Sequence, residues 1–515
     1  MALLPRLGDR SSGVLLHLTS LPGPHGSGDL GDEAVAFADA LARHEQRWWQ
    51  MLPVGPSGYG DSPYSALSAF AGDPILLDLE TLGVPVAPPP AFATDDVAFE
   101  QVRAYREAHL RSTHAAFAHA PRAERVAYEA YCERERAWLS DWALYDALKR
   151  EQGGAPWVRW PEPLRDRHPD ALAEARVRLA ADVDRACFVQ FRFDEQWARL
   201  RAACAERGVA LLGDVPIFVA HDSADVWQHR ELFHLDARGE PTVIAGVPPD
   251  YFSATGQRWG NPLYRWKRIA ETGYAWWVAR MKKALTRFDA VRLDHFIGFA
   301  RYWEIPAAEP TAMKGVWRKG PGRPLFDAIR AELGDLPLVA EDLGDVTTSV
   351  RRLRRELGLP GILLVQFAFG TDPQAPRFVP HAHTRKSVVY TGTHDNDTTL
   401  GWFFDPGGEG STRTVEEAER ERRAVLDYLG RNGAEAEEIH WDVLRLVWSS
   451  VAATAIAPMQ DVLGLGTEAR MNRPGTTGGR NWRWRMPELP GAAMERLARM
   501  TRTYGRARPR APAPR

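Results

Sequence analysis

The sequence predicts an α/β protein, a (β/α)8 TIM barrel with large, mainly helical insertions between its barrel strands. Three observations predict it: short apolar runs rich in β-branched residues, stretches of helical spacing between many of them, and loops rich in Gly, Pro, Asp or His after them. Strands that alternate with helices pair in parallel, and eight such strands, as found here, fit a closed barrel. A doubly wound open sheet is the alternative, which is weakened because no GxGxxG or Walker loop follows a strand.

The predicted strands follow one another along most of the chain. In order they are Val14–Leu18, Trp48–Val54, Val209–Asp214, Ala290–Asp294, Leu338–Glu341, Gly361–Phe367, Val388–Thr393 and Ile456–Leu463. Helical spacing between them is clearest in Asp32–His44, Phe326–Leu333 and Thr348–Leu357. This alternation assigns the whole chain, 1–515, to a single catalytic barrel with insertions.

Insertions are required because the chain is about twice as long as a typical barrel. The largest, 78–185, lies between the second and third strands, and its apolar and charged residues alternate with helical spacing. A second, 223–283, is rich in Trp, Gly and Pro and is expected to cover the substrate. A third, 405–450, is expected to be helical, and the basic, Pro-rich end, 502–515, is expected to be disordered.

Charge and cysteine content exclude several classes of function. A formal net charge of −2 leaves no basic field for nucleic acid. The chain has three widely spaced cysteines, Cys132, Cys187 and Cys204, without a CxxC pair for zinc or redox chemistry. Its first residues lack the apolar core of a signal peptide, and no apolar run reaches the length of a membrane span. We therefore expect a cytoplasmic protein with no membrane or nucleic-acid partner.

Carboxylates follow four of the predicted strands. Asp214, Asp294, Glu341 and Asp395 each stand at or just after a strand end. In a barrel these ends converge on one mouth, where several carboxylates repel one another and are costly to desolvate. Each one alone is explained by a helix cap or a salt bridge. Four in series indicate a use for the charge.

Two uses fit such a cluster: binding of a divalent metal, or glycoside chemistry with one carboxyl as acid and another as nucleophile or base. His295 and His394 are available as metal ligands, so residue type does not exclude a metal. Arg292, two residues before Asp294 and on the same strand face, argues against it. An arginine there repels a cation but keeps a nucleophilic carboxylate ionised.

Two of these strand ends, Arg292–His295 and Thr393–Asn396, resemble signature segments of the α-amylase clan. The sequence AEDLG at Ala340–Gly344 is closer to one branch, the 4-α-glucanotransferases called amylomaltases or disproportionating enzymes. The resemblance covers nearly the whole chain and extends to Thr19–Pro22, Gly60–Tyr64, Gly213–Ile217, Pro248–Pro262, Arg470–Asn472 and Asn481–Arg485. The Asp250–Pro262 loop together with the Asn481–Arg485 segment is its most specific part.

The resemblance implies a retaining transfer of α-1,4-glucan segments from maltooligosaccharides, starch or glycogen. Asp294 is then the nucleophile, Glu341 the general acid/base, and Asp395 a ligand of sugar hydroxyls that favours the transition state. It implies neither a metal nor a cofactor, because every step is a proton transfer or a displacement at an acetal carbon. His17 is expected to be structural. Substrate contacts are expected from Arg292, His394, Asp214, Tyr64, Asp250, Tyr251, Phe252, Gln257, Trp259, Asp372 and Asn472.

Three other functions stay open at this point. An α-amylase-type hydrolase shares the fold and the carboxylates and differs only in using water as the acceptor. A non-catalytic, glucan-binding barrel is expected to have lost at least one carboxylate, whereas this chain keeps all of them. A metal-dependent barrel hydrolase is the third, and chelators would inhibit it.

Overall fold

A closed barrel of parallel strands forms the centre of the computed structural model, which describes residues 3–249, 255–409, 411–431, 438–489 and 491–508. Within these residues, eight strands close the barrel: β1 (Ser11–Leu15), β2 (Trp48–Gln50), β3 (Ala210–Pro216), β6 (Ala290–Asp294), β9 (Leu338–Ala340), β10 (Gly361–Leu364), β11 (Ser387–Tyr390) and β12 (Thr454–Pro458). β1 pairs with β2 on one side and with β12 on the other, so the first and last strands meet. Each barrel strand overlaps a predicted one, and the predicted fold class is confirmed.

The barrel strands are buried on both faces, which is why they read as apolar runs rather than as alternating ones. Val14, Trp49, Leu212, Val291 and Ile362 are all completely buried. The last predicted strand is displaced: β12 ends at Pro458, and the apolar residues after it form the short helix α18 (Met459–Leu463). An apolar run this short does not distinguish a buried strand from a buried helix by itself.

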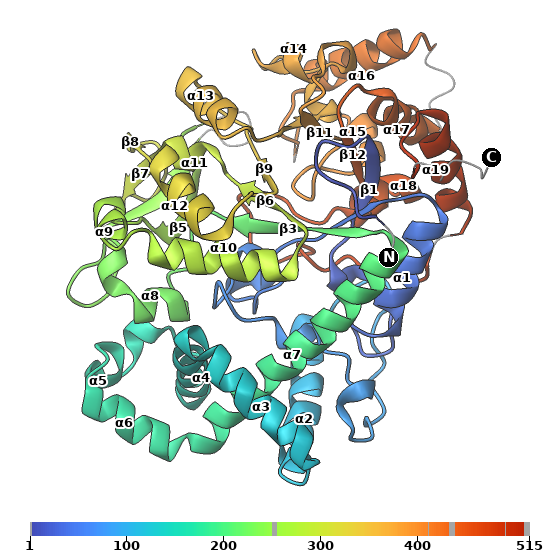
Figure 1. Ribbon diagram of the computed structural model, residues 1–515. Coiled ribbons are helices and arrows are strands. Elements are labelled where there is room, and N and C mark those ends of the chain that lie inside the picture. The colour runs from blue at the N-terminus through green and yellow to red at the C-terminus, as the bar shows by residue number, and fades with distance from the viewer. Residues whose placement is uncertain (1–2, 250–254, 410, 432–437, 490, 509–515) are drawn as a thin grey trace.

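Helices surround the barrel (Figure 1). The predicted helical stretches fall on α1 (Asp32–Arg43), α12 (Arg323–Leu333) and α13 (Thr348–Glu356). The segment 405–450 carries α16 (Val415–Leu429), which starts with a capping box of Thr414 and Glu417, and α17 (Ile439–Ser449). Short helices α11 (Ile297–Ala300), α14 (Ala375–Phe378) and α15 (Thr399–Phe404) follow β6, β10 and β11. No helix of the described residues is long and apolar enough to span a bilayer.

The long connection from β2 to β3 builds a helical subdomain that lies to one side of the barrel, in the lower part of Figure 1. It consists of α2 (Phe99–Phe117), α3 (Arg122–Arg134), α4 (Arg136–Glu151), α5 (Glu162–Arg165), α6 (Pro169–Arg178) and α7 (Ala180–Arg207). Aromatic rings form its core, with Phe117 and Phe188 centred 4.8 Å apart. The 28-residue α7 ends at Gly208, whose φ of 75° makes the turn that returns the chain to β3.

A second, antiparallel sheet has the order β5-β4-β7-β8 and combines two insertions. β4 (Val243–Val247) and β5 (Gln257–Pro262) come from the segment 223–283, which also holds α8 (Ala224–Gln228), α9 (Trp266–Glu271) and most of α10 (Ala275–Arg287). β7 (Arg301–Pro306) and β8 (Val316–Lys319) come from the connection after β6. Residues 250–254 between β4 and β5, which include the predicted contacts Asp250, Tyr251 and Phe252, lie outside the described residues.

The C-terminal segment is ordered farther than expected, so the prediction of disorder from residue 502 is wrong for residues 502–508. Helix α19 (Ala492–Thr503) ends at Thr503, and a turn after it leads to Arg506, whose side chain is completely buried. Its guanidinium donates to the backbone oxygens of Ser11 at 3.0 Å, Trp448 at 2.7 Å and Ser450 at 2.8 Å, and also to Ala452 and Ala453. A basic, Pro-rich composition does not reveal that one arginine satisfies these carbonyls. Residues 509–515 lie outside the described residues.

Replacing Arg506 by Ala is expected to lower the free energy of unfolding by about 3 kcal/mol, because buried carbonyls lose a charged donor. Urea denaturation followed by circular dichroism measures the loss. Arg508→Ala is the matched control, since Arg508 is exposed, and it should leave stability unchanged. Equal stability of the two variants would show that the Arg506 contacts contribute nothing.

Candidate active site

A cleft of about 480 Å³ opens where the barrel strands end. Its walls come from segments far apart in the sequence, as expected for the C-terminal mouth of a barrel. It collects most of the predicted site residues on one surface. Those that line it are Tyr64, Gln257, Trp259, Arg292, Asp294, Glu341, His394, Asp395 and Asn472.

Arg292 lies between two carboxylates. On β6, Arg292 and Asp294 point to the same face, and the register of β3 with β6 places Asp214 opposite Arg292. Arg292 Nη1 is 2.5 Å from Asp214 Oδ2 and 2.9 Å from Asp294 Oδ1. Tyr64 Oη donates to the same Asp214 oxygen at 2.8 Å. Burial raises the pKa of Asp214 to about 7, while the Arg292 guanidinium opposes this shift.

Asp294 is accordingly held in place by an ion pair, and its side chain keeps 26% of its surface exposed to the cleft. A carboxylate that is paired with a buried guanidinium and still accessible on its other oxygen is suited to nucleophilic attack. Asp214 differs because its side chain is fully buried under Arg292. Asp214 does not line the cleft, and its Oδ2 contacts Arg292 and Tyr64.

Glu341 follows β9 and is buried at the base of the cleft. Its Oε2 accepts from the backbone N–H of His295 at 2.7 Å, and its Oε1 accepts from that of Leu343 at 3.0 Å. Burial raises the pKa of Glu341 well above its usual range, and the charge of Asp294 adds to the shift, whereas Arg292 and the two N–H donors oppose it. A carboxyl that holds its proton near neutral pH can act as a general acid.

The turn after β6 brings the His295 amide to Glu341. His295 has a φ of 50°, a left-handed conformation that is uncommon for a residue other than glycine. Such conformations concentrate at sites where the surrounding structure imposes them for function. Sequence reasoning named His295 only as a possible metal ligand and missed this backbone role, for which the residue types carry no signal.

Asp395 is presented by the loop after β11. Its Oδ1 accepts from Asn472 Nδ2 at 2.6 Å, and its backbone oxygen accepts from Arg470 Nη2 at 2.7 Å. Its Oδ2 is 3.4 Å from His394 Nε2. The Asp395 side chain is 42% exposed, so it keeps acceptor positions for hydroxyl groups in the cleft.

Aromatic rings form one wall beside these carboxylates. The Tyr64 ring stacks on the His394 imidazole, with centroids 5.1 Å apart and planes at 17°. The Trp482 ring lies 5.8 Å from Tyr64 and has no predicted role in the site. Like His295, Trp482 has a positive φ, of 68°. The only signal for Trp482 in the sequence is its place in the family-specific segment Asn481–Arg485.

The second insertion supplies one edge of the cleft through β5. The Trp259 indole meets the His295 ring edge to face at 4.8 Å, and Trp259 Nε1 donates to Gln257 Oε1 at 3.1 Å. Trp259 remains 37% exposed and lines the cleft.

Asp372 lies apart from the catalytic carboxylates. It lines an adjoining cavity of about 1440 Å³, which shares Phe367 and Asp395 with the cleft. Asp372 Oδ1 accepts from the backbone N–H of Gln374 at 2.6 Å, so one of its oxygens organises its own loop. A contact between Asp372 and a ligand therefore requires a chain long enough to extend from the cleft into this cavity.

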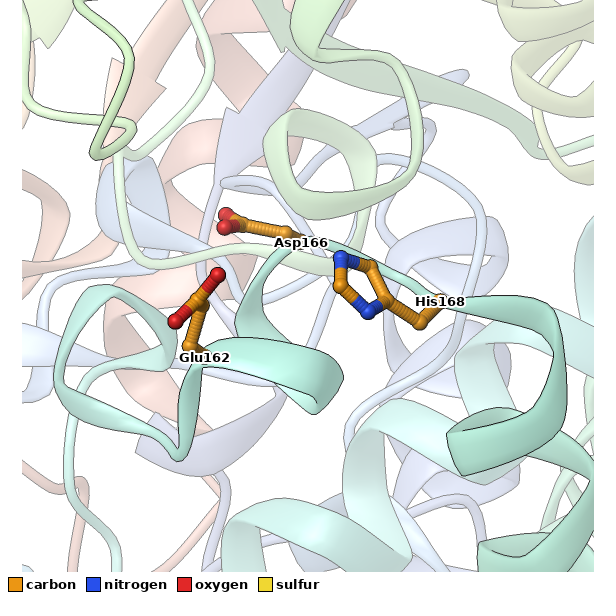
Figure 2. A group of neighbouring side chains, drawn as sticks. All are labelled: Glu162, Asp166 and His168. Carbon is orange, nitrogen blue, oxygen red and sulfur yellow. The ribbon is translucent and has the colours of Figure 1, made fainter.

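Among the His, Cys, Asp and Glu side chains of the described residues, one group could hold a metal ion: Glu162, Asp166 and His168. Their ligand atoms lie within 4.8 Å of one another, around α5 in the helical subdomain (Figure 2). Asp166 already pairs with Arg165 at 2.7 Å and with Arg230 at 2.6 Å. Two guanidinium groups on one carboxylate repel a cation, so the group is explained as a surface ion-pair network.

Comparison with known proteins decides the family. The sequence profile described as 4-α-glucanotransferase matches residues 16–490. The chain belongs to this family. The resemblance found in the strand-end motifs is thereby confirmed, and this family member is an enzyme rather than a binding protein built on an inactive barrel.

Curated relatives match almost end to end. The enzyme is 50% identical over 489 residues to the 4-α-glucanotransferase of Thermus thermophilus, covering 94% of this chain and 95% of that one. It is 44% identical over 513 residues to the 4-α-glucanotransferase of Synechocystis, covering 97% and 99%.

Among solved structures, the amylomaltase of Streptococcus agalactiae in complex with acarbose has a TM-score of 0.89. It is 35% identical to this enzyme, and the match covers 97% of this chain and 100% of the other. The barrel and its insertions thus resemble those of a solved amylomaltase over nearly the whole chain.

Proposed function

We propose that this 4-α-glucanotransferase transfers α-1,4-glucan segments by retaining double displacement at Asp294 and Glu341. The observation that carries the proposal is the contrast between these two carboxyls in one cleft. Asp294 is ion-paired with Arg292 and accessible, while burial raises the pKa of Glu341. A retaining mechanism needs this division, one carboxylate for attack and one carboxyl that keeps its proton.

In the first step, Glu341 donates its proton to the glycosidic oxygen while Asp294 Oδ attacks the anomeric carbon. The C1–O bond breaks, the shortened glucan leaves with a new hydroxyl, and a β-glucosyl ester of Asp294 remains. In the second step, the ionised Glu341 takes the proton of an acceptor 4-hydroxyl, whose oxygen attacks C1 and releases Asp294. Two inversions retain the α configuration.

Asp395, His394 and Asn472 are proposed to bind hydroxyls of the sugar that reacts. The Asn472 amide holds Asp395 Oδ1, and Asp395 Oδ2, which lies 3.4 Å from His394 Nε2, keeps an acceptor position for a hydroxyl that moves as the ring flattens. The Tyr64 ring offers its face to the apolar side of the sugar. These contacts strengthen as charge develops on the ring and thus favour the transition state.

The substrates are proposed to be α-1,4-glucans: maltooligosaccharides, starch or glycogen. The catalytic cleft continues into the cavity that Asp372 lines, which provides room for several sugar units on a chain. The similar amylomaltase was solved in complex with acarbose, and the relatives named 4-α-glucanotransferase support glucans as the class of substrate. The unpaired cysteines support the expected reducing, cytoplasmic compartment.

Transfer and hydrolysis are distinguished with pure maltotriose. We expect free glucose together with a series of longer maltooligosaccharides, at a nearly constant number of reducing ends, because each bond that breaks is made again. Chromatography of the products and a reducing-end assay measure both quantities. A steady rise in reducing ends without longer products would identify the enzyme as an α-amylase-type hydrolase.

The segment 223–283 is proposed to cover the substrate, since a transferase must favour a dilute sugar over water at roughly 55 M by positioning and exclusion. Trp259→Ala is expected to raise the ratio of hydrolysis to transfer several-fold, because the rim of the cleft becomes open to water. Trp317→Ala is the control: Trp317 lies in the same sheet, on β8, but does not line the cleft. An unchanged ratio in Trp259→Ala would remove Trp259 from this role.

A further inference from the structure

Two buried histidines lie on either side of a small cavity behind the aromatic wall. His17 follows β1 and His394 follows β11, and both strands are neighbours of β12 in the barrel. The side chains are almost fully buried, with 7% and 5% of each residue exposed. In the described part of the chain, Nδ1 of His17 and Nδ1 of His394 are buried without a hydrogen-bond partner. Buried polar atoms of this kind are rare and call for an explanation.

The cavity has a volume of about 20 Å³ and is lined by both histidines. Its other walls include Ser20, Thr393 and Gln460, so it is polar. A polar cavity above about 10–15 Å³ holds one ordered water when two or more partners face it. One water in this cavity, bonded to both Nδ1 atoms, would satisfy both of them.

Both imidazoles are neutral near pH 7. Burial lowers the pKa of His17 to about 3, and the neighbouring His394 adds to the shift. Burial also lowers the pKa of His394; Asp395 and Asp294 oppose the shift and Arg292 adds to it. A neutral imidazole carries one N–H, and the partner of one ring nitrogen decides which nitrogen has the proton.

We propose that His17 is a positioning residue of the transfer reaction, which favours one tautomer of His394 through a water in the cavity that both residues line. His17 Nδ1–H donates to the bridging water, and that water donates to His394 Nδ1. His394 then carries its proton on Nε2, 3.4 Å from Asp395 Oδ2, where it donates toward that carboxylate and the sugar. Stacking on Tyr64 holds the plane of the ring. The Asp395 carboxylate accepts on the Nε2 side and the bridging water donates on the Nδ1 side, so both partners favour the same tautomer. The inference rests on the proposed role of His394 in sugar binding.

Three substitutions separate the Nδ1 contact from the volume of the side chain. In His17→Asn, the side-chain amide stands where Nδ1 stands in histidine. In His17→Gln, the amide stands near the position of Nε2. His17→Phe keeps an aromatic ring but has no polar atom. We expect His17→Asn to retain kcat/KM for maltotriose within about twofold. His17→Gln and His17→Phe should lose roughly tenfold, which corresponds to one hydrogen bond.

Nitrogen-15 NMR of histidine-labelled enzyme without substrate reads the tautomer directly, with the His394 resonances assigned by His394→Gln. Wild type and His17→Asn should show a protonated Nε2 at His394, and His17→Phe should show a mixture of both tautomers. Because no reaction occurs, this measurement is independent of the proposed mechanism. Failure of the Asp294 and Glu341 assignments would appear in kinetics and leave the tautomer result intact.

His383→Asn is the matched control, because His383 is a buried histidine that uses both nitrogens far along the chain from the cleft. Nδ1 contacts Ser450 Oγ at 2.7 Å and Nε2 contacts the Phe378 oxygen at 2.7 Å. The His383→Asn variant should have a lower melting temperature but an unchanged kcat/KM at temperatures where the enzyme is folded. An unchanged His394 tautomer in His17→Phe would overturn the proposal. The proposal would also be overturned if all three His17 variants lost kcat/KM equally and these losses matched their losses of stability.

Discussion

Replacing Asp294 by Asn is expected to lower kcat for maltotriose by about 10⁴-fold or more, because the amide cannot form the glucosyl ester. Arg292 would lose one of its two carboxylate partners and retain Asp214, so the cleft should keep its shape. Asp289→Asn is the matched control. Asp289 precedes the same strand and binds Arg201 and the Leu211 N–H away from the cleft, so its loss should affect stability rather than turnover.

Chemical labelling tests the same assignment without relying on a loss of rate. A slow-turnover fluorinated α-glucosyl substrate should add the mass of one fluorosugar to a peptide that contains Asp294, as read by mass spectrometry after proteolysis. The Asp294→Asn variant should remain unlabelled. A label on another carboxylate would reject Asp294 as the nucleophile, whatever the kinetics of the variant.

Replacing Glu341 by Gln is expected to lower ester formation from maltotriose by about 10²–10⁴-fold, the usual contribution of a general acid. The first step with α-glucosyl fluoride should be nearly spared, because fluoride leaves without a proton. Rapid-quench measurement of fluoride and of the glucosyl ester compares the two donors. Equal losses with both would show that Glu341 is not the acid.

The pH profile provides a second test of Glu341. The acid works only while protonated, so the rate of ester formation falls as the pH rises through its raised pKa. This basic limb should disappear in Glu341→Gln. Asp342→Asn is the control: Asp342 is buried next to Glu341 but pairs with Arg354 and Arg377 and accepts from the Ile362 N–H. It should keep the basic limb even where it lowers stability.

The barrel was predictable because its signal is local. A strand buried on both faces must be apolar over its own four or five residues, and a helix that covers it must show its own spacing. Every barrel strand was placed within a few residues on this basis. The prediction was wrong at β12 because the strand ends at Pro458 and the apolar residues after it form helix α18. A buried strand and a buried helix both require apolar residues, so the sequence does not show where one ends and the other begins.

The meeting of Asp294, Glu341 and Asp395 in one cleft was predictable for a related reason. Parallel strands in a barrel all deliver their C-terminal ends to one mouth, so position along the strand implies position in space. Asp372 shows the limit of this argument: it stands in a loop well after its strand, and the loop carries it into the adjoining cavity. Asp214 was placed at the mouth correctly, but only the structure shows it buried beneath Arg292.

The barrel, the convergence of Asp294, Glu341 and Asp395, and the family were all predictable from the sequence. The first two depend on residues within one strand and its following loop, and the family shows in motifs spread along nearly the whole chain. Only the folded chain shows the pairing of β4 with β7 across two insertions, the burial of Arg506, the amide of His295 at Glu341, and the cavity that His17 and His394 line. These contacts join residues that are distant in sequence and depend on the direction of single backbone or side-chain groups. No periodicity or composition encodes such directions, because the closed barrel and its packed loops impose them.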